Sequence, residues 1–169
     1  MTISWCRVAT KLGPFHIAAH GGRIVRSALP GTSTRSFLAD LAPLGRVEPV
    51  ESPRDPALAK AARQLVEYAS GARTAFSVDV DPVGTLFQRR VWSELSRIPY
   101  GQTRSYADVA VGIGKPGAAR AVGQANNRNP VAPFIPCHRV VAADGGIGGY
   151  GGGIDLKQRM LRIEGARLA

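Results

Sequence analysis

The sequence predicts an α+β protein in two parts: a small N-terminal domain with an antiparallel sheet and a helix, then a mainly helical C-terminal domain. Three observations support this prediction. Short apolar runs, broken by the pair Gly21-Gly22, fill the first part of the chain. From residue 85 onwards, apolar residues recur with helical spacing. The tract at residues 81–85, which contains proline and glycine, separates the two patterns, so we expect domains at residues 1–82 and 83–169.

Strands open the N-terminal domain. Residues 3–9 and 15–31 are predicted to be extended, with a hairpin turn at Gly21-Gly22. Residues 74–82 are predicted as a further strand with one buried face, because apolar side chains alternate there at Phe76, Val78 and Val80.

Two helices are expected in the same domain. A short helix covers residues 33–42 and begins at a hydroxyl residue that can serve as its N-cap. A longer helix covers residues 53–71. Asp55 can cap this helix, Pro56 suits its first turn, and Gly71 stands where a C-terminal glycine belongs.

Four helices are expected in the C-terminal domain, over residues 85–98, 105–114, 117–127 and 156–165. Three prolines exclude a helix from residues 129–136. A tight turn that contains glycine joins the second helix to the third, as in a helix-turn-helix. The alternative is a plain pair of packed helices.

The third of these helices is unusually thin. Small residues fill most of its length, and Arg120 is its one long cationic side chain before the end. A thin helix lets its backbone approach another helix or a groove closely. The small residues are Gly117, Ala118, Ala119, Ala121, Gly123 and Ala125.

The charge distribution favours a polyanionic partner. The net charge is +10, and residues 83–169 hold 12 basic and 5 acidic residues, which gives them +7. Such an excess is typical of nucleic-acid binding, although a basic protein without that partner remains an alternative. The N-terminus lacks the pattern of a secretory signal, and no apolar run is long enough for a membrane span.

The stretch "FIPCHRVVAADGGIGGYGGGID", residues 134–155, holds one of the chain's two cysteines. Cys137 and His138 are adjacent and would face different sides of a regular element, but the kink expected at Pro136 could bring the imidazole toward the thiol. His138, Arg139 or a helix N-terminus could raise the thiolate fraction, and Glu164 could orient the histidine. The alternative is a small buried hydrophobic residue.

Three competing motifs fail. The run Gly146–Gly151 matches a dinucleotide-binding pattern, but only 18 residues follow it, too few for the rest of that fold. The sequence contains no phosphate-binding P-loop. No metal site is predicted, since Cys6, His16, His20, Cys137 and His138 are scattered. Two distant cysteines indicate reduced thiols and an intracellular, cytoplasmic protein.

The segments "ARAVGQANNRNP", "IPCHRVV" and "GGYGGGIDLKQRML" resemble the O6-alkylguanine-DNA alkyltransferase family, and the similarity extends over residues 85–167. Residues 1–80 match more loosely. The resemblance implies a ribonuclease H-like N-terminal domain and a C-terminal domain that binds DNA through a helix-turn-helix. It also implies the activity: one irreversible transfer of an alkyl group from O6 of guanine to the protein's own cysteine, without a cofactor.

The resemblance further assigns roles to residues of the reacting centre. Cys137 is the acceptor, His138 is its base through a water molecule, and Glu164 orients that histidine. Tyr106 donates a hydrogen bond to the guanine ring as the base leaves. Asn129 supports the active-site loop, and Lys157 adds positive potential.

The implied partner is double-stranded DNA that contains O6-alkylguanine. The damaged base is flipped out of the duplex, and Arg120 fills the gap that it leaves. The thin helix would enter the minor groove through Ala119, Gly123 and Ala125, with Arg128 near its end. Tyr150 and Gly151 would form a wall beside the base. The expected state is a monomer in solution, with cooperation along DNA left open.

Two other functions remain possible on the residues alone. A non-enzymatic sensor of alkylated DNA would keep the scaffold but replace the cysteine, and Cys137 argues against it. A thiol hydrolase built on Cys137, His138 and Glu164 would turn over repeatedly, and it leaves Arg120 and the thin helix unexplained.

Overall fold

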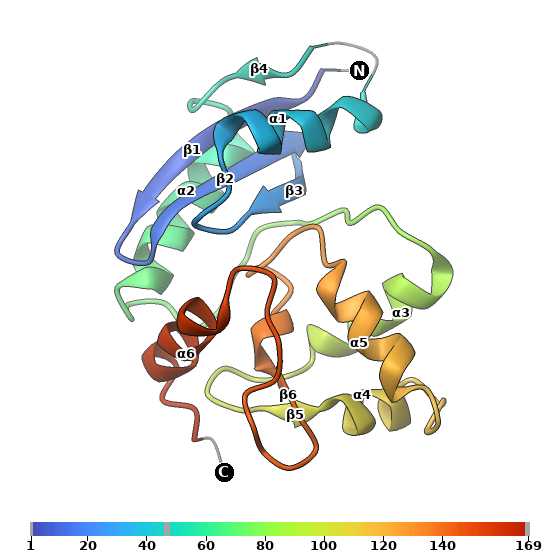
Figure 1. The fold of residues 1–169 in the computed structure, drawn as a ribbon. Coiled ribbons are helices and arrows are strands. Elements are labelled where there is room, and N and C mark those ends of the chain that lie inside the picture. Colours follow the sequence, from blue (N-terminus) through green and yellow to red (C-terminus); the bar gives the residue numbers. More distant parts are fainter. Residues whose placement is uncertain (1, 46–47, 168–169) are drawn as a thin grey trace. The chain divides into compact units, whose positions relative to one another are not determined.

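The α+β class is confirmed by a computed structural model, which describes residues 2–45 and 48–167. The chain divides into two compact units, residues 1–82 and residues 83–169 (Figure 1). Within the described residues, no helix has both the length and the apolar character needed to cross a membrane.

The first unit is built on a four-stranded sheet with the order β3-β2-β1-β4. Strands β1 (Ser4–Thr10), β2 (Gly13–His20) and β3 (Arg23–Ala28) run antiparallel, as the sequence predicts. The hairpin between β2 and β3 turns at Gly21 and Gly22, whose φ angles of 57° and 78° suit glycine. The short strand β4 (Val50–Glu51) pairs parallel to β1 and was not predicted.

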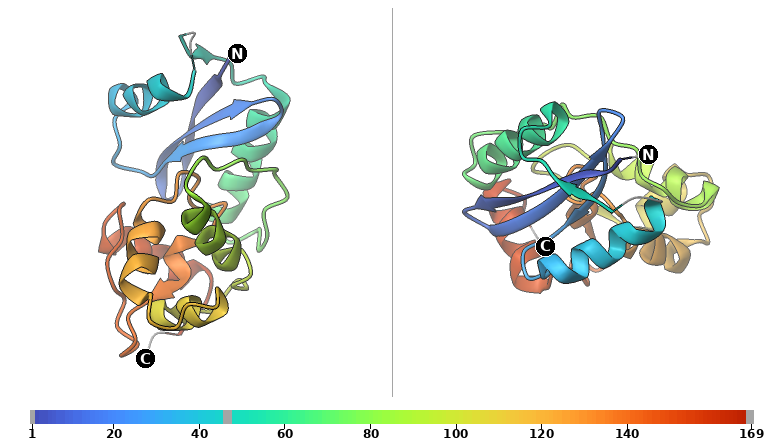
Figure 2. Two further views of the ribbon diagram at one scale, coloured as in Figure 1. Left: turned by 90° about the vertical axis from the view of Figure 1, so that its right-hand side faces the viewer. Right: turned by 90° about the horizontal axis from the view of Figure 1, so that it is seen from above.

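Two helices cover opposite faces of this sheet (Figures 1 and 2). Helix α1 (Thr34–Leu41) is capped by Ser33 and is followed by the 3₁₀ helix η1 (Ala42–Leu44). Helix α2 (Pro56–Ala69) is capped by Asp55, whose carboxylate accepts hydrogen bonds from two backbone N–H groups. Both predicted helices are confirmed. The core beneath α1 is apolar and holds Ile3, Trp5, Ala18, Val25, Phe37 and Leu41.

The strand predicted at residues 74–82 does not form, but its predicted alternation is confirmed, because Phe76, Val78 and Val80 are half-buried and the residues between them are exposed. Only Val80 bridges to the sheet, beside Ile24 of β3. The reason lies in α2, because Gln64 donates from Nε2 to the Ser77 hydroxyl at 2.7 Å and accepts from the Ser77 N–H at 2.9 Å. Lys60 donates to the Ser77 carbonyl oxygen at 2.8 Å. Side chains of α2 thus satisfy the backbone groups that a strand would have used.

Helices α3 (Leu86–Leu95), α4 (Tyr106–Gly112) and α5 (Ala119–Asn127) pack together in the second unit. Capping boxes at Thr85 and Ser105 fix the starts of α3 and α4.

The remaining elements of this unit are the 3₁₀ helix η2 (Cys137–Arg139), helix α6 (Ile154–Ile163) and a pair of short strands. Strands β5 (Arg104–Ser105) and β6 (Val140–Val141) pair in parallel, and neither was predicted. Figure 1 shows η2 between α5 and α6.

Candidate active site

Cys137 begins the 3₁₀ helix η2 at the end of an irregular, fully buried segment. Residues 130–141 are all buried, and Cys137 itself is 4% exposed. The prolines of this segment prevent an α-helix, and the chain instead turns tightly at Pro136. The Cys137 N–H donates to Ile135 O at 2.9 Å, and the Arg139 N–H donates to Pro136 O at 3.1 Å. Local sequence thus places the thiol on a short, rigid turn.

Two asparagines from α5 and the turn after it hold this segment. Asn129 donates from Nδ2 to Ile135 O at 2.7 Å and accepts from the Val131 N–H at 3.1 Å. Asn126 donates from Nδ2 to Cys137 O at 3.4 Å. The helix-turn-helix and the cysteine turn are therefore joined by side chains, and Asn126 is a link that the sequence analysis missed.

Glu164, the C-cap residue of α6, joins His138 and Arg139. His138 Nε2 is hydrogen-bonded to Glu164 Oε2, and Arg139 Nε donates to Glu164 Oε1 at 2.7 Å. A carboxylate can only accept, so Nε2 carries the hydrogen and Nδ1 is the basic nitrogen of the neutral ring. Burial lowers the pKa of His138, and Glu164 opposes that shift in part. His138 is thus a neutral base, oriented by a buried carboxylate.

Arg139 takes a different place from the one expected. Its position in the sequence made it a candidate for raising the thiolate fraction, but its guanidinium pairs with Glu164 and donates to Ile98 O at 2.7 Å. It also lies 5.8 Å from the centre of the Tyr100 ring. The Gly101 N–H adds a hydrogen bond to Glu164 at 3.3 Å. The turn at residues 99–102 was predicted as a loop, but only the tertiary fold reveals that it supports Glu164.

The Cys137 thiol is protonated at rest. Burial raises its pKa, and three neighbours oppose that shift: a hydrogen bond from Asn129, the charge of Lys157 and a hydrogen bond from Tyr150. These groups stabilise an anion at sulfur once the proton has left. A protonated thiol needs a proton acceptor to become a nucleophile, and the neutral imidazole of His138, the next residue of the turn, is the candidate general base.

Lys157 lies fully buried in α6. Its ammonium donates to Val140 O at 2.7 Å and to Gly149 O at 3.1 Å. Burial lowers the pKa of Lys157 to about 8, while Cys137 opposes that shift. No carboxylate of the described residues lies within ion-pair distance of this ammonium. The charge therefore faces the thiol, and the same side chain ties the glycine tract to β6.

The glycine tract passes close to Tyr106, the first residue of α4. A Cβ at Gly148 would lie 3.3 Å from the Tyr106 hydroxyl and 3.6 Å from Lys157 Nζ, and the φ of Gly148 is 71°. A side chain there would strain the backbone and crowd both polar groups. Tyr106 is half-buried, and burial raises the pKa of its phenol, with the charge of Cys137 adding to the shift. Tyr150 is half-buried, and its one hydroxyl hydrogen can go either to Met160 Sδ, at 3.7 Å, or to Cys137.

The predicted DNA-contacting residues are spread over the surface of the same unit. Arg120 is exposed on the first turn of α5, Arg128 is exposed at its C-cap, and Gly151 is exposed in the glycine tract. Ala119 and Gly123 are half-buried. Ala125 differs, because it is 2% exposed and lies on the inner face of α5, where its carbonyl oxygen accepts from Trp92 Nε1 at 2.8 Å. Its side chain packs inside the unit.

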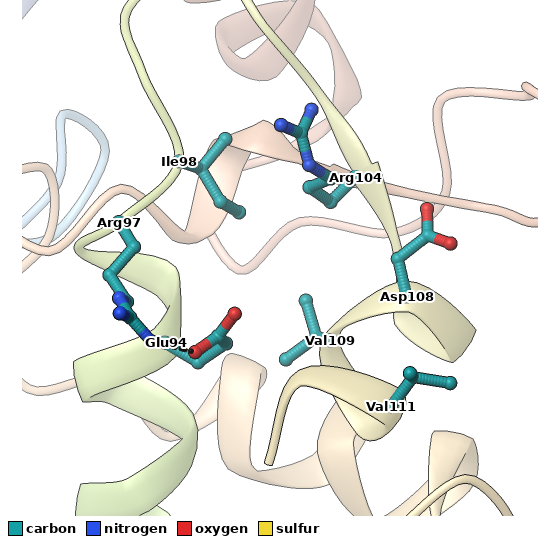
Figure 3. A pocket seen from close by; sticks show the side chains of 7 residues that line it. All are labelled: Glu94, Arg97, Ile98, Arg104, Asp108, Val109 and Val111. Atoms are coloured by element: carbon teal, nitrogen blue, oxygen red, sulfur yellow. Dashed lines mark hydrogen bonds and ion pairs between the residues drawn. The ribbon is translucent and has the colours of Figure 1, made fainter. Parts of the chain in front are cut away.

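A separate cavity of about 490 Å³ lies between α3 and the start of α4 (Figure 3). Its charged side chains already have partners, because Glu94 pairs with Arg97 at 3.4 Å and Asp108 accepts from the Ser105 N–H at 2.9 Å. Cys137 does not line it. This cavity therefore lacks both the nucleophile and an unsatisfied polar group, and the candidate site is the cluster around Cys137.

Comparison with known families identifies both units. Residues 6–82 match the family described as "6-O-methylguanine DNA methyltransferase, ribonuclease-like domain", and residues 86–166 match "6-O-methylguanine DNA methyltransferase, DNA binding domain". A methylated-DNA--protein-cysteine methyltransferase of Mycobacterium bovis is 43% identical over 169 residues, covering 98% of this chain and 94% of that protein. A constitutive one of Bacillus subtilis is 48% identical over 119 residues, covering 70% and 72%.

Two solved structures are similar to this chain over nearly its whole length. The crystal structure of Mycobacterium tuberculosis O6-methylguanine methyltransferase is 40% identical with a TM-score of 0.81, covering 99% of this chain and 95% of that one. The structure of Mycobacterium tuberculosis OGT in complex with DNA is 39% identical with a TM-score of 0.81, covering 98% and 93%.

Proposed function

This chain belongs to the O6-methylguanine-DNA methyltransferase family, and from this premise we propose that it repairs DNA by moving an alkyl group from O6 of guanine to Sγ of Cys137. The enzyme class of this family is methylated-DNA--protein-cysteine methyltransferase. The observation that carries the assignment to Cys137 is its environment: a buried thiol, next to a neutral histidine that a buried carboxylate orients.

The transfer is a nucleophilic substitution at the alkyl carbon, with guanine as the leaving group. His138 takes the thiol proton through a water molecule, and the sulfur electron pair attacks the alkyl carbon of the lesion. A C–S bond forms, the C–O6 bond breaks, and the released electron pair stays on guanine. Tyr106 stabilises that developing charge with a hydrogen bond, and one proton restores neutral guanine. The thiol supplies both electrons and proton, so the reaction needs no cofactor.

The product explains why each molecule acts once. An alkyl thioether has no good leaving group, so water does not displace the alkyl group from sulfur. No described residue of the site is assigned a role in regenerating the thiol. The protein is therefore a reagent as much as a catalyst, and its capacity equals its copy number.

The lesion must leave the duplex to reach the buried thiol. We assign Arg120 to the gap left by the flipped base, because it is a long, exposed cation at the start of α5. Ala119 and Gly123 would face the minor groove, Arg128 a phosphate, and Tyr150 and Gly151 the flipped base. Ala125 is not part of this proposed surface, because its side chain is buried.

Gly123 supports the assignment of α5 to a groove. A Cβ at this position would lie 3.7 Å from the Tyr106 ring, which is ordinary contact, so packing within the protein does not require glycine. Glycine inside a helix costs roughly 0.5–1 kcal/mol relative to alanine. A close partner outside the protein, such as the wall of a DNA groove, gives that cost a reason.

We further propose that the protein acts as a monomer on double-stranded DNA in the cytoplasm, where its substrate lies and thiols stay reduced. Binding in the minor groove would depend mainly on shape and charge, since the residues assigned to it offer few base-reading groups.

Intact mass after incubation with a duplex that contains O6-methylguanine tests the function. We expect a gain of one methyl group per molecule, located on the Cys137 peptide, after which the reaction stops. Cys6→Ser should leave this result unchanged, and Cys137→Ser should abolish transfer but retain DNA binding. Continued turnover would identify a hydrolase instead, and DNA binding without any mass gain in the wild type would identify a lesion sensor.

A further inference from the structure

Asn126 is a buried polar residue for which the mechanism above has no use. It lies in the last turn of α5 and is 2% exposed. Its Nδ2 reaches Cys137 O at 3.4 Å, which is a long hydrogen bond. Its Oδ1 is shielded from solvent and accepts no hydrogen bond from the described residues. A side chain of this kind is costly to bury unless its oxygen meets a donor.

The energetic cost of burying Asn126 Oδ1 without a partner indicates that this oxygen meets a hydrogen-bond donor. A buried acceptor without a donor destabilises a protein by about 1–3 kcal/mol, and an apolar side chain of similar shape would avoid that cost. Buried waters commonly satisfy such groups when other polar partners are near. The Cys137 thiol and the His138 imidazole belong to the same buried turn and can supply those partners.

We propose that Asn126 is a further positioning residue of the transfer reaction, which holds the Cys137 carbonyl with its nitrogen and a water beneath the thiol with its oxygen. This inference rests on the proposed function, since the water is the one that passes the thiol proton to His138. Asn126 does not touch the lesion. It fixes the distance between the sulfur and the base that activates it.

The position of Asn126 also ties the reacting turn to α5. It lies six positions after Arg120, so the two residues are about 9 Å apart along the helix axis. The Trp92 Nε1 bond to Ala125 O anchors this end of α5, and the Asn129 N–H donates to Asn126 O at 3.3 Å. The last turn of α5, the helix assigned to DNA, therefore carries the side chain that is hydrogen-bonded to the Cys137 carbonyl.

Other groups also influence the thiol, and the test must separate them from Asn126. Those that face Cys137 are Asn129 after α5, Tyr106 of α4, Tyr150 of the glycine tract and Lys157 of α6, with His138 next in the chain. All five residues are unchanged in a variant at position 126. A change in thiol titration would then report on Asn126 and the water that it holds.

The decisive variant is Asn126→Leu, which keeps the approximate shape and removes both polar atoms. Asn126→Ser is the conservative partner, because a hydroxyl with a second water can replace part of the amide. Asn127→Leu is the matched control, since Asn127 is the exposed neighbour on the same helix. Three quantities are measured for each: the single-turnover rate with free O6-methylguanine base and with the duplex, duplex affinity, and the pH dependence of thiol alkylation by iodoacetamide.

We expect Asn126→Leu to slow transfer about 100-fold with both substrates, the size of effect that a small displacement of reacting groups produces. Duplex affinity should change less than about twofold, and the thiol titration should move to higher pH, since the water that Asn126 Oδ1 holds, a donor to the thiolate, is lost. Asn126→Ser should recover part of the rate, and Asn127→Leu should match the wild type.

Two results would overturn the proposal. One is an Asn126→Leu protein with lower thermal stability but an unchanged thiol titration and maximal rate, which would make Asn126 purely structural. The other is an Asn126→Leu protein whose transfer rate returns to that of the wild type at saturating duplex, which would place the effect in DNA binding and not in the transfer step. Failure of the wild type to transfer any methyl group would instead overturn the proposed function, so the two failures are distinguishable. If Asn126→Leu does not fold, the comparison of Asn126→Ser with the wild type decides by the same readouts.

Discussion

The two cysteines of this chain show how a nucleophile differs from a buried thiol. Cys6 and Cys137 are 3% and 4% exposed, and burial is the main cause that raises the pKa of each. Exposure alone would not tell them apart. Around Cys6 in β1, the carboxylates of Asp55 and Glu51 add to the effect and bring its pKa to about 11.

The neighbours of Cys137 act in the opposite direction. Hydrogen bonds from Asn129 and Tyr150 and the charge of Lys157 all favour the thiolate. His138, oriented by Glu164, adds a proton acceptor. Reactivity thus comes from groups that stabilise the anion and receive the proton, and only Cys137 has both among the described residues.

The largest expected loss follows from removing the proton acceptor. His138→Ala should slow transfer by about 10²–10⁴-fold, the range that a positioned general base contributes, while duplex affinity stays near that of the wild type. His20→Ala is the control, because His20 lies in the first unit and bonds to Thr2 O. Single-turnover rates measure both. A His138→Ala protein that transfers at the wild-type rate would show that His138 is not the base that activates Cys137.

Arg120→Ala separates the chemistry at the thiol from delivery of the base. Transfer from duplex DNA should fall roughly 10- to 100-fold even at saturating DNA, because flipping costs a few kcal/mol that Arg120 helps to offset. Transfer from free O6-methylguanine base should be unchanged. Single-turnover assays at several DNA concentrations check this. Full recovery at high DNA concentration would reduce Arg120 to a phosphate contact.

Lys157→Met removes the buried charge that distinguishes the surroundings of the two thiols. The pKa of Cys137 should rise further, because the Lys157 charge that favours the thiolate is lost, and both the thiolate fraction and the transfer rate at neutral pH should fall. Iodoacetamide labelling against pH gives the titration directly. An unchanged titration would mean that the hydrogen bonds alone stabilise the thiolate.

Lys157→Met should also change how the free energy of unfolding depends on pH. The pKa of Lys157 is about 8 in the folded protein and 10.5 in the reference state, so the unfolded chain binds more protons between these values. Folding is then penalised at low pH, and that penalty is relieved as pH rises from about 8 to 10.5. The free energy of unfolding of the wild type should therefore rise relative to that of Lys157→Met across this window, by up to roughly 3 kcal/mol. Thermal denaturation at several pH values measures the difference.

The elements that could be predicted from sequence are those with local determinants. Helix α2 has a capping aspartate, a proline in its first turn and a glycine after its end, all within the segment itself. Strands β4, β5 and β6 have two residues each and exist only through their partners. The segment at residues 74–82 has the alternation of a strand, yet Gln64 from α2 takes the backbone bonds of Ser77. Tertiary competition of this kind leaves no mark in the segment.

The residues of the candidate site can likewise be divided into those that were predicted from sequence and those that were not. The resemblance singled out Cys137, His138 and Glu164; in the fold, His138 follows Cys137 on η2 and is hydrogen-bonded to Glu164. Arg139 was one candidate for raising the thiolate fraction, but its guanidinium pairs with the buried Glu164 carboxylate and donates to the carbonyl oxygen of Ile98. Its partners come from the C-cap of α6 and from the turn after α3, so nearness to the cysteine in sequence did not predict contact with the thiol.

The smallest expected effect concerns Cys6. Glu51 is exposed on β4, and Glu51→Lys would replace one of the carboxylates that raise the Cys6 pKa with a cation. Solvent screening should limit the resulting fall in the Cys6 pKa to less than about one unit, visible as slightly faster iodoacetamide labelling at high pH. Methyl transfer should still occur at Cys137 alone. In the variant Cys6 gains a cationic neighbour, but it still lacks a general base and a site for the flipped guanine. Peptide mapping after reaction with the methylated duplex measures this, and methylation of Cys6 in the variant would show that electrostatics alone selects the acceptor.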